Sequence, residues 1–577
     1  ILLLLGATIG LPYFLLSSTS PLLQAWYVRR SGSGMPYRLF ALSNFGSMLA
    51  LITFPFIVEP RLTSREQAYI WSGAYVAFAL VCIYAGWRSR FGKNIAAPGM
   101  AEKAGPRPPA DELALWVALA ACASTLLVAI TNHLSQNVAP IPLLWVVPLA
   151  LYLATFIVAF ESDNIYRRWI FLPLLVPALG GMAYMLWANE GNLNIKFVIP
   201  GFAAGLFLCC MVCHGELARR KPAPAHLTLF YLMVSLGGAI GGIFVALIAP
   251  RVFRSFLELQ IGMIACALLA AAVLWNVKMK NLGAWPVRAV TIAGCLALTG
   301  YLARSQYKDN KGYRLAERNF YGVLHVRDNK LGSGLPDRVL LYGTINHGEE
   351  VMTDQLRYAP ISYYGPESGI GRAMRVLQDR GPVRAGVIGL GAGVLSTYGR
   401  AADRFRIYEI NPLIENIAQT QFGYYPHSSA DKRIMMGDAR LTLERQESQQ
   451  FDMLAVDAFS SDAIPIHLLT REALELYFRH LKPDGILALH VSNRYLDLVP
   501  VCARGAQDLG KAAMVVEDDG GAADYMSAST WVLVTAHPAW FDNDAFKDAD
   551  IYPAKAPRGF RAWTDDYSNL FEILKID

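Results

Sequence analysis

A chain of 577 residues in which 54% are hydrophobic and only 17% are charged is too apolar to be a single soluble globule, and it is long enough for two or more domains. The net charge of +6 is mild for this length and requires no nucleic-acid partner, because membrane proteins carry excess Lys and Arg in their cytoplasmic loops. Of the eight cysteines, all but Cys502 fall in apolar segments, which argues against a disulfide framework.

Apolar segments long enough to cross a bilayer recur from the start of the chain. Because the first of them begins at Ile1 with no initiator Met, we expect further residues before it. Two stretches rich in small residues, 201–205 and 237–242, favour close packing between helices. The ten predicted spans lie near residues 1–26, 38–58, 67–87, 112–132, 142–160, 169–187, 196–216, 227–249, 256–277 and 286–304.

Polar and metal-binding patterns are scarce in these spans. His133, His214 and Glu216 lie near predicted helix ends, where we expect packing or interfacial roles. The segment Cys210 to His214 matches the C-x-x-C-H pattern of haem attachment, but an apolar helix leaves little room for a covalent haem, and we expect none. We also expect no metal site, because the histidines of the polar half lack partners at ligand spacing: His347, His467 and His490.

The second half of the chain has α/β character. β-Forming runs at 320–326 and 338–345, separated by a turn rich in Gly, Pro, Asn and Asp, predict a small β-hairpin domain. Alternating strand and helix patterns follow and predict an α/β domain. The predicted domains are, in order, a multi-span helical membrane domain 1–304, a polar linker 305–318, a β-hairpin domain 319–365, a Rossmann-like α/β domain 366–540 and a tail 541–577.

A glycine-rich loop opens the α/β domain. The apolar run 385–390 leads into three glycines at alternate positions, Gly389, Gly391 and Gly393, and a helix-compatible segment follows. In a βαβ unit of this spacing, glycines let the backbone approach a nucleotide closely, and the helix N-terminus offers free N–H groups. The pattern is G-x-G-x-G rather than the dinucleotide pattern G-x-G-x-x-G, which favours a ligand of the S-adenosylmethionine type over NAD.

Acidic residues end the strands that follow. Glu409 comes 20 residues after Gly389, at the end of the second strand, where it is placed to accept hydrogen bonds from a ribose diol. Asp438, which precedes Ala439, ends a third strand within reach of an adenine amino group, and Asp457 ends a fourth. Because the carboxyl ends of parallel strands meet at one edge of a sheet, the sequence predicts that these groups line one crevice.

From about residue 319 to 500 the chain resembles the spermidine synthase (polyamine aminopropyltransferase) family, in which a β-hairpin domain precedes a methyltransferase-like Rossmann fold. The whole chain is similar to bacterial proteins described as fused major-facilitator/spermidine synthases. The motifs that carry this resemblance are Leu11-Pro12-Tyr13-Phe14-Leu15-Leu16, Cys213-His214-Gly215-Glu216-Leu217, Phe320-Tyr321-Gly322-Val323-Leu324, His347-Gly348, Pro360-Ile361-Ser362-Tyr363-Tyr364-Gly365 and Val456-Asp457-Ala458-Phe459-Ser460-Ser461-Asp462-Ala463-Ile464-Pro465.

The resemblance implies an aminopropyltransferase-like enzyme whose co-substrate is decarboxylated S-adenosylmethionine or S-adenosylmethionine. The loop Gly389–Gly393 would then hold the methionine-like or aminopropyl end of the nucleoside. Glu409 would bind the ribose, and Asp438 with Ala439 would bind the adenine.

The resemblance also implies an amine site. Asp457 would deprotonate the attacking amine, and Asp462 would help to hold a cationic amine. Tyr363 or Tyr364 would form a wall of this site. Carboxylates suit these tasks because they supply both a base and an attraction for a polycation.

Several positions depart from the family pattern. Ala392 stands where soluble members usually have an acid that contacts the free amine of the donor. Tyr342-Gly343 replaces an Asp-Gly pair, Asn346 replaces a Gln, and Tyr363-Tyr364-Gly365 replaces Tyr-His-Glu. Three hypotheses therefore stand: an aminopropyltransferase, a membrane-bound methyltransferase that uses S-adenosylmethionine, and a non-catalytic subunit or transporter-like scaffold.

The basic loops 27–38, 88–107 and 217–226 are cytoplasmic by the positive-inside rule, and we expect a multi-pass protein of a bacterial inner (cytoplasmic) membrane. Counting ten spans from these loops places the residues after 304 outside the cell. An adenosyl co-substrate instead predicts that the α/β domain lies in the cytoplasm, so both orientations remain open. The expected partners are the lipid bilayer, a small amine or polyamine, and a membrane complex or a second copy of the chain.

Overall fold

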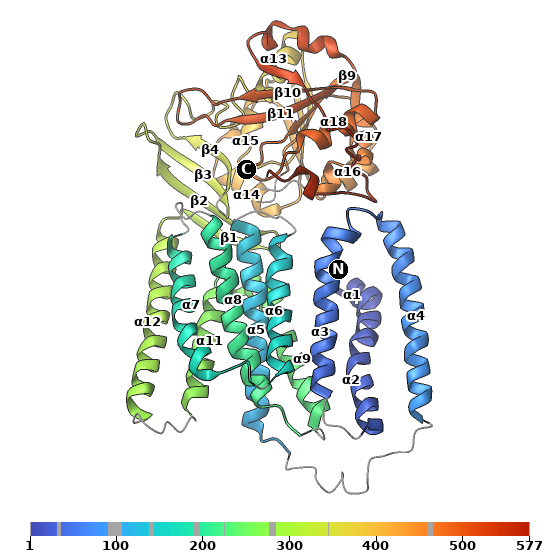
Figure 1. Ribbon diagram of the computed structural model, residues 1–577. Helices are drawn as coiled ribbons and strands as arrows, with labels where there is room; N and C mark the ends of the chain where they lie inside the picture. Colours follow the sequence, from blue (N-terminus) through green and yellow to red (C-terminus); the bar gives the residue numbers. More distant parts are fainter. Residues whose placement is uncertain are drawn as a thin grey trace. The chain divides into compact units, whose positions relative to one another are not determined.

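The computed structural model describes residues 2–31, 36–90, 107–137, 143–162, 164–188, 195–223, 226–275, 284–343, 345–458 and 465–575. Contacts between residues divide the chain near residue 307 into a helical unit and an α/β unit (Figure 1). The predicted linker 305–318 is partly helical, because the last helix of the first unit continues to Lys311 before the first strand begins.

Each of the ten predicted spans contains a long helix. Within the described residues, ten helical stretches are long and apolar enough to cross a membrane. Short π-helical turns interrupt three of these stretches, at Gly6–Gly10, Phe54–Val58 and Phe244–Ile248. The α-helices are α1 (Leu2–Leu5), α2 (Leu11–Ser31), α3 (Pro36–Thr53), α4 (Ser64–Arg90), α5 (Ala110–Asn137), α6 (Leu143–Glu161), α7 (Arg168–Ala188), α8 (Ile195–Arg219), α9 (Leu227–Ile243), α10 (Ala249–Val252), α11 (Glu258–Trp275) and α12 (Ala284–Lys311).

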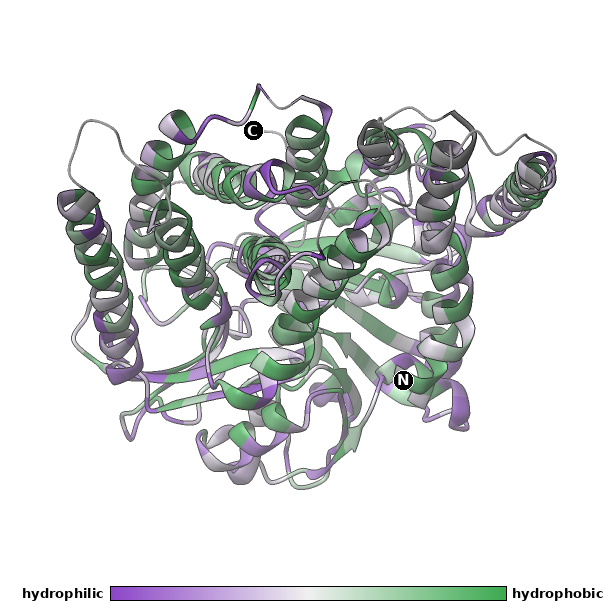
Figure 2. Cartoon of the chain, turned by 90° about the horizontal axis from the view of Figure 1, so that it is seen from below, coloured by the Kyte–Doolittle hydropathy of each residue, from purple (hydrophilic) through white to green (hydrophobic). Residues whose placement is uncertain are grey.

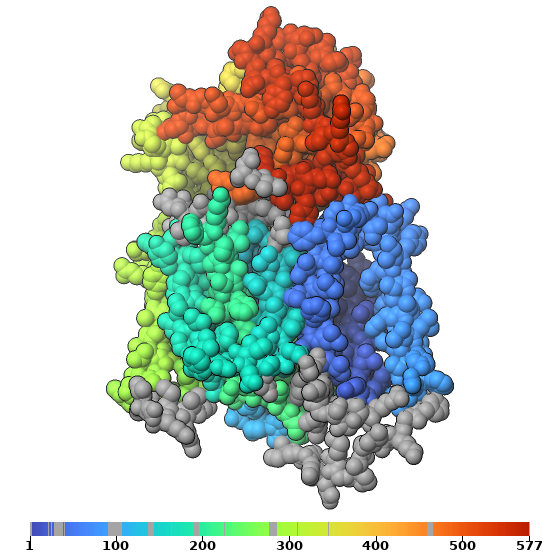
Figure 3. Space-filling model, viewed as in Figure 1, coloured from blue at the N-terminus to red at the C-terminus, as the bar shows by residue number. Residues whose placement is uncertain are grey.

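Large apolar side chains are exposed on the outside of these helices. Trp71 and Ile83 on α4, Val176 on α7 and Leu296 on α12 are all more than half exposed. Figure 2 colours most of the helical ribbon as hydrophobic, and Figure 3 shows α3 and α4 as separate columns with α2 between them. A helix that is apolar all round requires either a protein core or a lipid environment around it.

Glycines allow close contact between α5 and α9. A Cβ atom added at Gly237 would lie 2.4 Å from the carbonyl oxygen of Val117, and one at Gly241 would lie 2.5 Å from that of Ala121. Any larger residue would push the two helices apart. The prediction that the small residues of 237–242 serve close helix packing is therefore confirmed at these two positions.

Glu216 belongs to a buried network at the end of α8. Its side chain is fully buried and accepts two hydrogen bonds of 2.6 Å from Arg168 and one of 3.0 Å from the Tyr166 hydroxyl. Arg220 connects this network to Glu112 on α5 through an ion pair of 3.0 Å. A buried carboxylate needs such partners, so these contacts support the packing role expected of Glu216.

The α/β unit begins with a four-stranded antiparallel sheet in the order β1-β2-β3-β4. Its centre is the predicted hairpin, in which Leu324 pairs with Tyr342 and Val326 with Leu340. Additional strands flank the hairpin on both sides. The strands are β1 (Leu315–Asn319), β2 (Gly322–Lys330), β3 (Pro336–Tyr342) and β4 (Ile345–Val351).

An eight-stranded sheet follows, in the order β12-β10-β11-β9-β8-β5-β6-β7. The five adjacent strands β9-β8-β5-β6-β7 run parallel to one another. Strand β11 is antiparallel to both of its neighbours, β10 and β9. Since β5 pairs with β6 on one side and β8 on the other, the direction of winding reverses there, and ligands of open α/β sheets bind at such a point. The strands are β5 (Arg384–Ile388), β6 (Arg404–Glu409), β7 (Asp431–Met436), β8 (Phe451–Val456), β9 (Leu481–His490), β10 (Ala512–Asp518), β11 (Ser529–Thr535) and β12 (Asp550–Pro553).

Helices cover both faces of this sheet. Successive residues of a strand point to opposite faces, so Val387 packs in the core that contains residues of α13 and α14. Ile388 packs in the core that contains residues of α16, α17 and α18. The helices are α13 (Gly369–Arg380), α14 (Pro412–Thr420), α15 (Tyr424–His427), α16 (Ala439–Arg445), α17 (Arg471–His480) and α18 (Val499–Asp508). The predicted α/β character is thereby confirmed, but the sheet extends past the predicted boundary at residue 540, because its edge strand β12 lies in the predicted tail 541–577.

Candidate functional site

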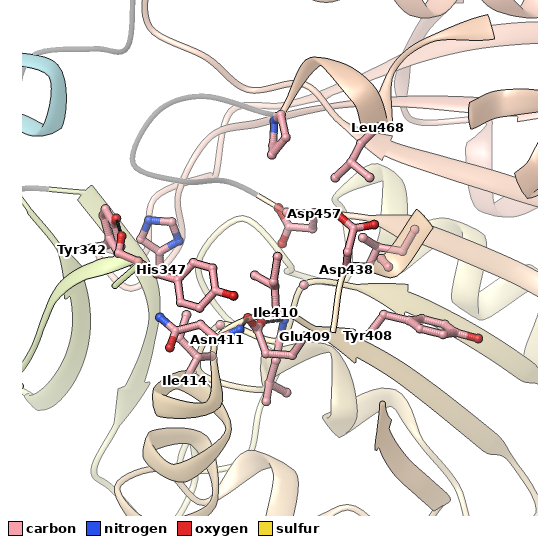
Figure 4. Close-up of a pocket in the computed structure, with 18 of the residues that line it drawn as sticks. Tyr342, His347, Tyr408, Glu409, Ile410, Asn411, Ile414, Asp438, Asp457 and Leu468 are labelled. Carbon is pink, nitrogen blue, oxygen red and sulfur yellow. Dashed lines mark hydrogen bonds between the residues drawn. The ribbon is translucent and has the colours of Figure 1, made fainter. Parts of the chain in front are cut away.

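A pocket of about 290 Å³ lies at the carboxyl ends of β5, β6 and β8, where the winding of the sheet reverses. In Figure 4, Tyr342 and His347 of the small sheet lie on one side of it, and Glu409, Asp438 and Asp457 of the large sheet lie opposite. The described lining residues are Tyr321, Tyr342, His347, Tyr363, Tyr364, Ile388, Gly389, Leu390, Gly391, Tyr408, Glu409, Ile410, Asn411, Ile414, Gly437, Asp438, Ala439, Asp457, Ala458, Pro465, His467 and Leu468.

The glycine-rich loop needs its glycines because other backbone lies against it. Gly389 has φ 99°, and a Cβ atom there would lie 2.3 Å from the carbonyl oxygen of Asp457. Gly391 has φ 53°, and its Cβ would lie 2.6 Å from the carbonyl oxygen of His347. Only glycine satisfies both the positive φ and the close approach. The loop is therefore fixed between β8 and β4, with its backbone exposed to the pocket.

Gly393 and Ala392 do not belong to the described lining. Gly393, with φ 86°, instead caps a single 3₁₀ turn at Val394–Tyr398, where the sequence predicts a longer helix. The Cβ atom of Ala392 faces Gly348, where an added Cβ would lie only 2.5 Å away. A larger acidic side chain at position 392 would need space that the strand β4 occupies.

Glu409 ends β6 and is held by the backbone. Its Oε2 accepts a hydrogen bond of 3.0 Å from the Leu390 N–H, and its Oε1 accepts one of 2.8 Å from the Asn411 N–H. Burial raises the pKa of this carboxyl, while the backbone N–H groups oppose that shift. An ionised carboxylate offers about four acceptor positions, so Glu409 keeps capacity for a ligand diol.

Asp438 caps the helix α16. Its Oδ1 accepts a hydrogen bond of 2.9 Å from the Leu441 N–H, and its Oδ2 lies 3.2 Å from Nε2 of His467. Capping is the ordinary structural role of an acid at this position. The same geometry also presents Asp438 and the first residue of the helix, Ala439, to the pocket.

Asp457 follows β8 and is held from two sides. The Tyr364 hydroxyl donates a hydrogen bond to its Oδ2, and Nδ1 of His490 lies 2.7 Å from its Oδ1. The side chain of Asp457 is only 5% exposed, and these two partners fix its orientation. The contacts differ from those of an ordinary turn acid or helix cap, because the carboxylate is paired with the side chains of two distant segments.

An aromatic stack positions His490 itself. Its ring lies between Tyr363 and Trp531, with centroid distances of 4.8 and 4.7 Å and near-parallel planes. Its Nε2 lies 2.8 Å from Oγ of Ser492. Since stacking and two polar contacts restrict the imidazole, it acts as a rigid support for Asp457.

Tyr363 and Tyr364, two of the tyrosines that line the pocket, remain protonated. Burial and the neighbouring Asp457 raise the pKa of Tyr364 well above its usual value, and the pKa of Tyr363 is raised by the same causes. Tyr364 can therefore act as a hydrogen-bond donor to the carboxylate over the whole physiological range of pH. Both of the tyrosines that the sequence proposes as a wall line the pocket.

His347 faces the pocket from β4 as a neutral group. Burial lowers its pKa to about 4, and its Nε2 has no hydrogen-bond partner among the described residues. Its ring meets that of Tyr342 edge to face at 5.8 Å. An unpaired ring nitrogen at the pocket is available to a polar group of a ligand.

The described lining contains three carboxylates and no Lys or Arg: Glu409, Asp438 and Asp457. An acidic pocket without a fixed cation attracts cationic ligands and repels a pyrophosphate. This charge pattern agrees with the preference for a sulfonium nucleoside over NAD that the glycine spacing indicates.

The sequence alone does not identify the role of His490. Val456 and Leu489 are paired in the parallel ladder of β8 and β9, so the next residues, Asp457 and His490, lie side by side. The position of His490 at a strand end is visible in the sequence, but the pairing requires the strand order. Asp462, which the resemblance assigns to amine binding, lies outside the described residues.

Comparison with known proteins finds a likeness over part of the chain. No protein-family model matches the chain. Over 113 residues the chain is 35% identical to a polyamine aminopropyltransferase of Vibrio vulnificus (strain CMCP6). The match covers 18% of this chain and 36% of that protein, so the chain spans about a third of the length of this curated relative.

Solved structures include similar chains. One is a probable spermidine synthase of Corynebacterium glutamicum ATCC 13032, with 15% identity and a TM-score of 0.33 over 45% of this chain and 98% of that one. Another is the spermidine synthase of Thermotoga maritima, with 13% identity and a TM-score of 0.29 over 46% of this chain and 85% of that one.

Proposed function

We propose that the α/β unit binds an adenosyl sulfonium compound and transfers its aminopropyl group, or a related group, to an amine. The observation that carries this proposal is the charge of the pocket, whose described lining has three carboxylates and no Lys or Arg. Both expected reactants are cations, and the likeness to a polyamine aminopropyltransferase points to the same substrate class.

The nucleoside is expected at the glycine-rich loop. Gly389 and Gly391 expose backbone beside the ribose site, and Glu409 accepts hydrogen bonds from the ribose hydroxyls. Asp438 and the N–H of Ala439 bind the edge of the adenine. Each group already lies at the pocket and is fixed by backbone hydrogen bonds or by its helix. This arrangement leaves the sulfonium directed towards Asp457.

In the proposed reaction, the nitrogen lone pair of the amine forms a C–N bond with the methylene carbon next to the sulfonium. The C–S bond breaks, and its electron pair returns to sulfur, which releases methylthioadenosine. An amine that arrives as an ammonium cation first passes a proton to Asp457, which frees the nitrogen lone pair for this attack. Tyr364 and His490 act as positioning residues, because each holds one oxygen of that carboxylate.

A membrane-bound methyltransferase is the second candidate. The Cβ atom of Ala392 faces Gly348, so position 392 supplies no acid to the free amine of an aminopropyl donor. Without that contact, a donor that keeps its carboxylate and transfers a methyl group is the alternative. The third candidate, a non-catalytic subunit or transporter-like scaffold, predicts no turnover with either donor.

We further propose that the helical unit crosses a bacterial inner (cytoplasmic) membrane. Ten described helical stretches have the necessary length and apolar character, and large apolar side chains on α4, α7 and α12 are exposed. Lipid would cover these side chains.

The test is a turnover assay with the full chain in detergent or lipid nanodiscs. The protein is incubated with a diamine and either decarboxylated S-adenosylmethionine or S-adenosylmethionine, and products are identified by mass spectrometry. We expect methylthioadenosine and an aminopropylated amine from the decarboxylated donor. A methylated amine from S-adenosylmethionine would support the second candidate, and no product from either donor would contradict both enzymatic proposals.

A further inference from the structure

Three cysteines from different helices meet inside the helical unit. Cys122 on α5, Cys213 on α8 and Cys266 on α11 have Sγ atoms that all lie within 4.8 Å of one another. Their side chains are at most 4% exposed, and all three are free thiols. Cys209, one turn before Cys213 on α8, also contacts Cys266. We call Cys122, Cys213 and Cys266 the thiol cluster.

Close packing of the helices holds the thiol cluster together. A Cβ atom added at Gly262 of α11 would lie 2.9 Å from the side chain of Leu126 on α5, so this glycine lets the two helices approach. The Sγ of Cys122 lies 3.7 Å from the carbonyl oxygen of the same glycine. The sulfur atoms are therefore positioned by rigid helices rather than by loops.

The donor set is chemically selective. Sulfur is a soft ligand that favours Cu(I) and Zn(II), and the group contains no His or carboxylate donor among the described residues. A metal–thiolate bond is about 2.3 Å, so three sulfur atoms around one ion would be separated by about 4 Å. The observed separations of up to 4.8 Å need a contraction of less than about 1 Å to reach this geometry.

We propose that the thiol cluster is a trigonal, all-sulfur site for Cu(I) inside the helical unit. Three mutually close donors suit Cu(I), whereas a structural Zn(II) site normally takes four. Each thiol that becomes a thiolate releases one proton as the ion binds. One thiolate balances the single charge of Cu(I), so the other two cysteines bind as neutral thiols and the apolar interior holds no net charge.

This proposal differs from the expectation that the chain has no metal site. That expectation considers spacing along the sequence, and the three cysteines are separated by 91 and 53 residues. It also gives Cys213 of the C-x-x-C-H segment a role other than haem attachment. His214, the last residue of that segment, shares a hydrogen bond of 2.9 Å with Thr155 through its Nδ1.

The alternative is that the cysteines only fill space, since buried cysteine behaves as a small apolar residue. The test uses the full chain, purified in detergent, reduced and free of metal. Cu(I) is titrated anaerobically against a chromophoric Cu(I) chelator. We expect one Cu(I) per chain, and we expect each of Cys122→Ser, Cys213→Ser and Cys266→Ser to lower the affinity at least about a hundredfold.

Cys295→Ser is the matched control, because Cys295 lies on α12, outside the thiol cluster, and is half-buried. Its affinity for Cu(I) should equal that of the wild type. If a serine variant fails to fold, the alanine variant at the same position, which keeps the site apolar, replaces it in the titration. X-ray absorption of the Cu(I)-loaded wild type identifies the ligand atoms independently of any variant. It should show sulfur ligands alone, at about 2.3 Å.

Equal Cu(I) affinity in the three cluster variants and the control would contradict the site. So would nitrogen or oxygen ligands in the absorption spectrum. Tighter binding of Zn(II) that is lost in Cys209→Ser would replace the trigonal Cu(I) assignment with a tetrahedral zinc site, because the Cys209 side chain also contacts Cys266.

Discussion

Replacement of Asp457 by Asn removes the proposed base with little change in shape. In the wild type, Oδ2 accepts a hydrogen bond from Tyr364 and Oδ1 lies 2.7 Å from Nδ1 of His490. In Asp457→Asn, the oxygen of the new side-chain amide can still accept from Tyr364, and its NH₂ group can donate to Nδ1 of His490. His490 then carries its proton on Nε2 and donates to Ser492, 2.8 Å away. The variant should therefore fold.

The loss of activity follows from the role of the carboxylate. A positioned general base contributes about a hundredfold to ten-thousandfold to a rate, so Asp457→Asn should lower kcat at least about a hundredfold. That loss corresponds to about 2.7 kcal/mol of transition-state stabilisation. Methylthioadenosine is neutral and carries no attacking amine, so its Kd should change by less than about threefold, well under 1 kcal/mol.

The assay combines single-turnover measurement of methylthioadenosine release with calorimetric binding of methylthioadenosine. Tyr364→Phe is the matched control, because it removes one hydrogen bond to Asp457 but leaves the carboxylate in place. We expect that variant to lose about tenfold in kcat, equivalent to one hydrogen bond.

Two results would refute the account of Asp457. Turnover of Asp457→Asn at more than half of the wild-type rate would show that the carboxylate is not the base. Equal losses of kcat and of methylthioadenosine affinity, together with a lower Tm, would show that Asp457 serves structure rather than proton transfer.

Three further predictions concern the rest of the site. Asp438→Asn keeps an effective helix cap but turns an NH₂ group towards the adenine. The Kd of methylthioadenosine should therefore rise about tenfold to a hundredfold, with Tm unchanged. An unchanged Kd would remove Asp438 from the adenine site. Gly348 has φ 129°, and Gly348→Ala would place a Cβ atom 2.5 Å from the Cβ atom of Ala392. Gly334 has φ 86°, but a Cβ atom there meets no atom within 4 Å, so Gly348→Ala should lower Tm more than the control Gly334→Ala. Equal Tm values in the two variants would contradict the packing. The pKa of His347 is about 4 in the folded chain and about 6.5 in the unfolded chain, so the unfolded chain binds the proton first as the pH falls. The free energy of unfolding should therefore fall by up to about 3 kcal/mol between pH 6.5 and pH 4. An NMR titration of the folded chain that gives a pKa near 6.5 would contradict this.

The positions of Glu409, Asp438 and Asp457 at one pocket follow from the sequence. Each acid ends an apolar run of strand length, and parallel strands place their carboxyl ends at one edge. The ten apolar segments are equally evident, because a run of that length has few structural alternatives. These features depend on local pattern alone.

Features that depend on tertiary contacts could not be predicted from the sequence. The pairing of His490 with Asp457 requires that β9 lies beside β8. The direction of Ala392 towards Gly348 depends on how β4 meets the glycine-rich loop. The thiol cluster combines residues of three helices whose packing no local periodicity specifies. Likewise, Tyr342 and His347 enter the pocket from the small sheet, which the βαβ pattern does not include.

The most direct test of the central claim is calorimetric binding of decarboxylated S-adenosylmethionine, S-adenosylmethionine and methylthioadenosine to the purified full chain. The described pocket lining has three carboxylates and no Lys or Arg, so it should repel the carboxylate that S-adenosylmethionine retains. We predict that the decarboxylated donor binds at least about tenfold more tightly than S-adenosylmethionine. Tighter binding of S-adenosylmethionine would contradict aminopropyl transfer in favour of methyl transfer, and binding of none of the three would contradict a nucleoside site at this pocket.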